Sequence, residues 1–63
     1  MQIYQERVVD EKSELSEKLE KLEAFIGGTI YNSLPPSEQT ILSRQLLIMQ
    51  LYEQVLSERI GSF

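Results

Sequence analysis

The first half of the chain has apolar residues at the spacing of one face of an α-helix. They recur three, four or seven residues apart, and mostly Glu, Lys and Ser occupy the positions between them. Because an α-helix turns once in about 3.6 residues, this spacing places the apolar side chains on one side. The pattern predicts a helix over about residues 3–26 with a solvated charged face. Its apolar stripe consists of Tyr4, Val8, Leu15, Leu19, Leu22 and Ile26.

The second half is more apolar and predicts a helix over about residues 36–60. One stripe of this helix is expected to close on Val8, Leu15 and Leu22 of the first helix. That stripe contains Ile41, Ile48, Met49, Tyr52, Val55 and Leu56. Leu47 and Leu51 fall on another side, which a single partner helix cannot cover. The sequence therefore predicts that this second apolar side contacts another chain.

Local signals separate the two helices and set their direction. Gly27 and Gly28 are expected to end the first helix, since glycine accepts the left-handed conformation that closes a last turn, and Gly61 is expected to cap the second. Pro35 and Pro36 favour a helix start. The connector, residues 27–35, is short, which favours an antiparallel hairpin. We expect an all-α single domain, residues 1–63, in which two-helix hairpins assemble into a helical-bundle oligomer.

Composition supports association and excludes several kinds of chemistry. A chain of 63 residues forms a small core that usually needs help from disulfides, metal or association. Without Cys or His it has no disulfide, no thiolate or imidazole metal site and no Cys or Ser/His nucleophilic pair. We predict no catalytic residues, no metal and no cofactor, and hence no enzyme.

The net charge of −4 bears on possible partners. Neither half of the chain is basic, which argues against binding to duplex nucleic acid or to an anionic membrane surface. No apolar run approaches the roughly 20 residues that span a bilayer. A homo-oligomer that binds a small anion through a few cationic side chains stays compatible with this composition.

The candidate ligand-binding residues lie at the expected free end of the hairpin. Arg59 falls on the apolar side of its helix, where its guanidinium needs a partner. Glu11 can supply one; alternatively, Arg59, Arg7 and Lys12 hold phosphate oxygens while a tyrosine stacks on a base. Both interpretations stay open. The candidate residues are Tyr4, Arg7, Val8, Glu11, Lys12, Tyr52 and Arg59.

Arg44 lies close to Leu47 and Leu51 by helical angle, and these three residues form the candidate oligomer interface. Arg44 is expected to pair with an acidic residue of a neighbouring subunit or to line a ligand site between subunits. Val8, Leu15 and Leu22 occupy equivalent heptad positions, which also allows a coiled coil.

Two sequence blocks resemble a known family. The blocks are Arg-Val-Val-Asp-Glu-Lys-Ser-Glu-Leu-Ser-Glu-Lys-Leu-Glu-Lys-Leu-Glu-Ala-Phe-Ile at 7–26 and Arg-Gln-Leu-Leu-Ile-Met-Gln-Leu-Tyr-Glu-Gln-Val-Leu-Ser-Glu-Arg-Ile at 44–60. They resemble very small phage and prophage helical proteins related to one from crAss-like phages, over nearly the whole chain. The connector between the blocks does not align.

Small helical phage proteins of this general kind include oligomeric sponges that sequester nucleotide immune signals. The resemblance therefore implies a counter-defence protein of the host bacterial cytoplasm that binds a cyclic dinucleotide or an ADP-ribose-type messenger without turnover. The alternative is an oligomeric interaction or structural module with a host or virion protein partner.

Overall fold

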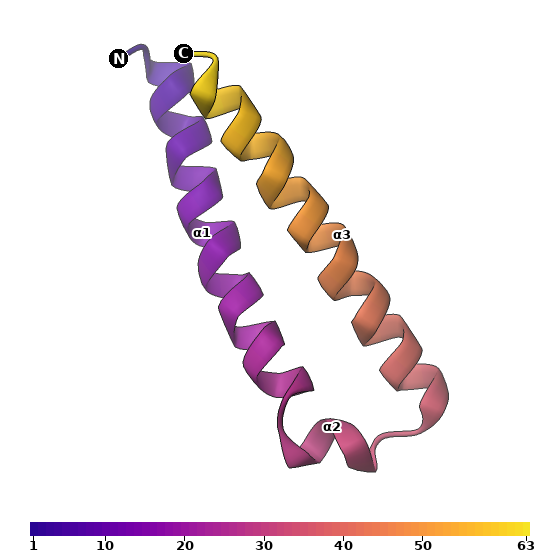
Figure 1. The fold of residues 1–63 in the computed structure, drawn as a ribbon. Helices are drawn as coiled ribbons and strands as arrows, with labels where there is room; N and C mark the ends of the chain where they lie inside the picture. The colour runs from indigo at the N-terminus through magenta and orange to yellow at the C-terminus, as the bar shows by residue number, and fades with distance from the viewer.

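The computed structural model describes residues 1–63 and consists of three helices without strands. Helix α1 spans Ile3–Ile26, α2 spans Thr29–Ser33 and α3 spans Pro36–Gly61. Figure 1 shows α1 and α3 running side by side in opposite directions, with both termini at one end and α2 closing the other. The predicted all-helical hairpin is confirmed, whereas its assembly stays a prediction. The connector contains the short helix α2, which the sequence pattern does not predict.

The molecule is a rod with a thin core. Its extents are 46 × 15 × 13 Å, and its radius of gyration is 14.5 Å, against about 11 Å for a compact domain of this length. Only four side chains are buried: Val8, Leu15, Leu19 and Leu56. No helix carries a stretch long and apolar enough to cross a membrane.

Helices α1 and α3 meet along a regular seam. Leu56 is completely buried and clusters with Val8 and Leu15, and Met49 and Ile60 pack against this cluster. The less exposed positions of α3 alternate three and four residues apart, the spacing of a coiled-coil seam. These positions are Gln39, Leu42, Leu46, Met49, Glu53, Leu56 and Ile60.

The sequence predicts that six residues of α3 close the hairpin on α1, and this prediction is wrong for four of them. Met49 and Leu56 do lie in the seam, but the side chains of the other four are 42–59% exposed. Closing the hairpin through that stripe would also turn Arg59 toward α1, and burying a guanidinium without a partner is costly. On α3, the seam that forms contains only one charged residue, Glu53, which accepts a hydrogen bond from Ser16. The exposed four are Ile41, Ile48, Tyr52 and Val55.

The helix ends do not use left-handed glycine, so that prediction is also wrong. No residue has positive φ, and Gly27 keeps a right-handed helical conformation with φ −77° and ψ −4°. Its N–H donates to the carbonyl of Glu23, and Gly28 then extends to begin α2. Gly61 is the last residue of α3, and Ser62 occupies the cap. Because α2 starts at once, the chain reverses through a short helix instead.

Hydrogen bonds between Tyr31 and Gln39 hold the closed end. Gln39 Nε2 donates to the carbonyls of Tyr31 and Leu34, both at 3.0 Å. The Tyr31 hydroxyl donates to the carbonyl of Gln39 at 3.1 Å and lies 2.7 Å from Ser43 Oγ. One glutamine of α3 thus satisfies carbonyl groups on both sides of the end of α2.

Replacing Gln39 with alanine is expected to lower the free energy of unfolding by about 1–2 kcal/mol, because connector carbonyls lose their donor. Urea unfolding at fixed protein concentration measures the loss. Gln50→Ala is the matched control, since Gln50 is an exposed glutamine of the same helix. Equal losses in the two variants would contradict a special role for Gln39.

Candidate ligand-binding groove

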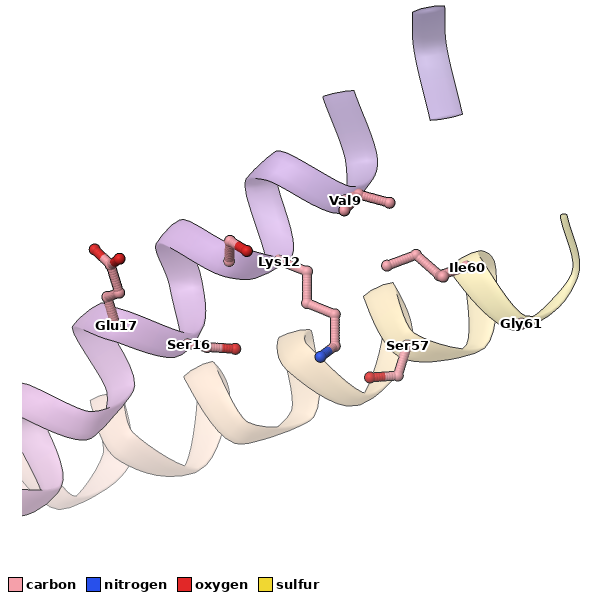
Figure 2. Close-up of a pocket in the computed structure, with 8 residues that line it drawn as sticks. Val9, Lys12, Ser16, Glu17, Ser57, Ile60 and Gly61 are labelled. Carbon is pink, nitrogen blue, oxygen red and sulfur yellow. The ribbon is translucent and has the colours of Figure 1, made fainter. Parts of the chain in front are cut away.

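A groove lies between α1 and α3 near the free ends of the hairpin (Figure 2). Its volume is about 600 Å³, within the roughly 300–1,000 Å³ typical of small-molecule sites. Both long helices contribute to the lining, which consists of Val9, Lys12, Ser13, Ser16, Glu17, Ser57, Ile60 and Gly61.

The seam places these side chains at one edge of the hairpin. Packing of Leu56 against Val8 and Leu15 fixes the rotation of both helices. Because the two helices run antiparallel and neighbouring positions on a helix differ by about 100°, the residues that directly follow seam positions on both helices face the same edge. Several of these residues are serine or glycine, whose small side chains leave space. A Cβ added at Gly61 would meet no atom within 4 Å.

Lys12 supplies the positive charge of the groove. Figure 2 shows the Lys12 side chain extending from α1 toward α3, with its ammonium group pointing toward Ser57. Lys12 is half-buried, so its methylenes cover apolar surface while the ammonium stays accessible. An ammonium group donates up to three hydrogen bonds. Glu17 also lines the groove, and in the same view its carboxylate end points away from Lys12.

Three serines line the groove together with Lys12. Ser16 Oγ donates to Glu53 Oε2 at 2.7 Å, a hydrogen bond that links α1 to α3 beside the groove. Ser13 and Ser57 are exposed, and each hydroxyl both donates and accepts. The groove therefore offers hydrogen-bond donors and acceptors together with one ammonium and one carboxylate, those of Lys12 and Glu17.

The other end of the groove is apolar. Val9 and Ile60 are half-buried, and Figure 2 shows their side chains pointing toward one another from the two helices. This end offers a contact surface for an apolar or aromatic part of a ligand. A small molecule with an anionic part and a flat or apolar part thus fits the chemistry of the groove.

The structure divides the seven ligand-binding candidates between four locations. Lys12 lines the groove, whereas Val8 is buried in the core. Tyr4 packs its ring edge-on against Phe63, with centroids 6.1 Å apart and planes at 81°. The remaining candidates lie at the same end of the hairpin but outside the groove lining. They are Arg7, Glu11, Tyr52 and Arg59.

The ion pair between Arg59 and Glu11, one of the two interpretations of Arg59, does not form in the structure. Arg59 is exposed, and the hydrogen bonds it accepts at its carbonyl come from Ser62. Because α3 turns Leu56 and Ile60 toward α1, Arg59 lies beside the seam and its guanidinium reaches solvent. Its use in an anion site stays a prediction.

Sequence reasoning missed most of the groove. The missed residues with hydrogen-bonding side chains are Ser13, Ser16 and Ser57. The sequence signal for the groove is a set of small residues next to the apolar positions of each helix. The predicted stripe of α3 places the wrong side of this helix against α1 and so turns Ser57 away from α1, which hides this signal.

The three candidate interface residues are all exposed on α3. Leu47 and Leu51 are 55% and 54% exposed, and Arg44 lies one turn before Leu47. Their role in assembly stays a prediction.

Comparison with known proteins gives one match. The sequence model of the Sequestin family matches residues 2–62. Neither a curated protein nor a solved structure matches the chain. Since the family match covers both long helices and the connector between them, this chain belongs to the Sequestin family.

Proposed function

We propose that this protein is a phage-encoded counter-defence protein that sequesters a nucleotide immune signal in the host bacterial cytoplasm. The signal is a cyclic dinucleotide or an ADP-ribose derivative, bound without turnover. The family name denotes sequestration, which supports stoichiometric binding. The resemblance of residues 7–26 and 44–60 to small phage proteins supports the biological setting.

The groove at the free end of the hairpin is the observation that carries the ligand class. It combines the Lys12 ammonium with the hydroxyls of Ser13 and Ser57 in a volume of about 600 Å³. Lys12 would bind a phosphate oxygen, and the serines would bind ribose hydroxyls or further phosphate oxygens. Val9 and Ile60 would contact the flat face of a base. These features support a small anionic nucleotide over a macromolecule.

The acidic character of the chain supports a small ligand as well. At a net charge of −4, the protein as a whole repels polyanions, so long-range attraction does not favour duplex nucleic acid. A single nucleotide that contacts one ammonium and a few hydroxyls needs only a local positive charge. Its affinity should therefore depend on these side chains more than on the overall charge.

Calorimetric titration with cyclic dinucleotides and with cyclic and linear ADP-ribose derivatives tests the proposal. We expect saturable heat with at least one class, with a dissociation constant below about 10 µM. Chromatography of the heat-denatured complex should return the ligand unchanged. Absence of heat from the whole panel would overturn the proposal, and recovery of a cleaved ligand would overturn binding without turnover.

The exposed apolar side of α3 supports a second candidate, an interaction or structural module for a host or virion protein. Ile48 and Leu51 are 59% and 54% exposed, and apolar surface of this kind commonly marks an interface. This candidate predicts a stoichiometric protein partner in a pull-down and indifference to every nucleotide in the panel.

A further inference from the structure

Helix α3 carries an apolar strip on the side away from α1, and Arg44 interrupts this strip between Ile41 and Leu47. At 100° per residue the strip covers an arc about 120° wide, roughly opposite the seam. Its five side chains are each 50–59% exposed, and Figure 1 shows no other segment beyond this side of α3. We call it the outer face of α3. It consists of Ile41, Leu47, Ile48, Leu51 and Val55.

The surface area of the chain indicates how much of it a partner would cover. The accessible area is 4798 Å² for 7.3 kDa, whereas a folded monomer of that mass averages about 4,200 Å². The excess is about 600 Å². A standard protein interface buries about 800 Å² on each partner. One additional contact of ordinary size would therefore bring the chain to the compactness of a typical folded protein.

The charges on the outer face favour a second copy of the chain as the partner. Arg44 and Glu58 are both exposed, and each lies seven residues from Leu51, on opposite sides of it. A second copy running antiparallel would place Arg44 of each chain near Glu58 of the other. A parallel copy would place like charges opposite each other, which is unfavourable. The strip is thus complementary in charge to its own reversed copy.

We propose that the outer face of α3 pairs with the same face of a second copy, antiparallel about a two-fold axis near Leu51. The result is a four-helix dimer with both α3 helices at its centre. A two-fold interface uses the same patch on both subunits, as the symmetric placement of Arg44 and Glu58 requires.

The order of side chains suits this packing. Ile41, Ile48 and Val55 are seven residues apart, and Leu51 lies between the last two, as β-branched and leucine positions alternate in coiled coils. In the antiparallel arrangement Ile48 packs near Leu51 of the partner subunit.

The groove remains open in this dimer, because Ser57 and Gly61 lie about 100° or more around α3 from the centre of the outer face. Pairing therefore does not depend on the ligand.

Sedimentation equilibrium of the full chain tests the pairing. We expect twice the chain mass of 7.3 kDa at micromolar concentration. Leu51→Glu should give a monomer, and Gln50→Glu, which adds the same charge on another side of α3, should stay dimeric. A wild-type mass other than that of a dimer would overturn the proposal, as would a dimeric Leu51→Glu.

Disulfide trapping tests the direction and does not require the monomer to fold. The chain has no cysteine, so any disulfide formed by a variant with one introduced cysteine joins two chains at that position. Leu51→Cys should crosslink under mild oxidation, because the two positions meet at the axis. Ile41→Cys should not, because its copies lie about 30 Å apart along an antiparallel pair, beyond disulfide reach. Efficient crosslinking at Ile41 would indicate a parallel pair and overturn the proposal.

Discussion

Replacing Leu56 with alanine is expected to lower the free energy of unfolding by about 2–5 kcal/mol, as large-to-small substitutions in protein cores do. Leu56 is the only completely buried side chain, and it contacts the cluster of Val8 and Leu15. The truncation would leave a cavity where the two helices meet. A core of four buried residues has little reserve, so much of the helical signal should be lost at ambient temperature.

Circular dichroism during urea unfolding, at fixed protein concentration, measures this effect. Ile3→Ala is the control, because Ile3 is an aliphatic residue of α1 whose side chain is 67% exposed. Its change should stay within about 0.5 kcal/mol. Similar losses from both substitutions would mean that the Leu56 cluster does not determine stability.

Replacing Lys12 with alanine is expected to weaken nucleotide binding by about ten- to a hundredfold. Hydrogen bonds to charged groups contribute about 1.5–3 kcal/mol, and Lys12 is the only cationic residue of the groove. The fold should tolerate the change, because Lys12 is half-buried at the edge of the seam and outside the buried cluster.

Calorimetry with a cyclic dinucleotide and with cyclic ADP-ribose measures the loss. Lys18→Ala removes the same charge from an exposed position of α1 outside the groove, and its affinity should match that of the wild type. Arg59→Ala tests the alternative ligand site, on the side of the hairpin that carries Arg59. If Arg59→Ala abolishes binding while Lys12→Ala does not, the ligand site is on the arginine side of the hairpin and not in the groove.

The two proposals use different surfaces of the hairpin: the groove for ligand binding and the outer face of α3 for pairing with a second copy. Residues next to the seam, such as Lys12 and Ser57, form the candidate ligand site, while Ile48 and Leu51 face away from it. This separation makes the two proposals independently testable. A monomer that still binds a nucleotide would leave the ligand proposal standing, and a dimer that binds none would leave the pairing standing.

The sequence by itself determined the helical class and the antiparallel hairpin. Apolar spacing in the first half is compatible with one helical face, so it correctly predicts that Val8, Leu15 and Leu19 are buried, although Tyr4 of the same stripe is 60% exposed. Pro35 and Pro36 mark the start of α3 through a local property, the fixed φ of proline. Such signals depend on residues within a turn or two of each other, which is why a single sequence is sufficient to identify them.

Only the tertiary structure decided the rotation of α3 about its axis. This helix is apolar on two sides, so its periodicity is compatible with either stripe facing α1. The choice depends on the partner helix: one orientation interlocks Leu56 with Val8 and Leu15, while the other turns Arg59 inward. The groove follows from the same choice, because Ser57 faces Lys12 only in the first orientation. Its location is a property of two packed helices, and neither helix specifies it alone.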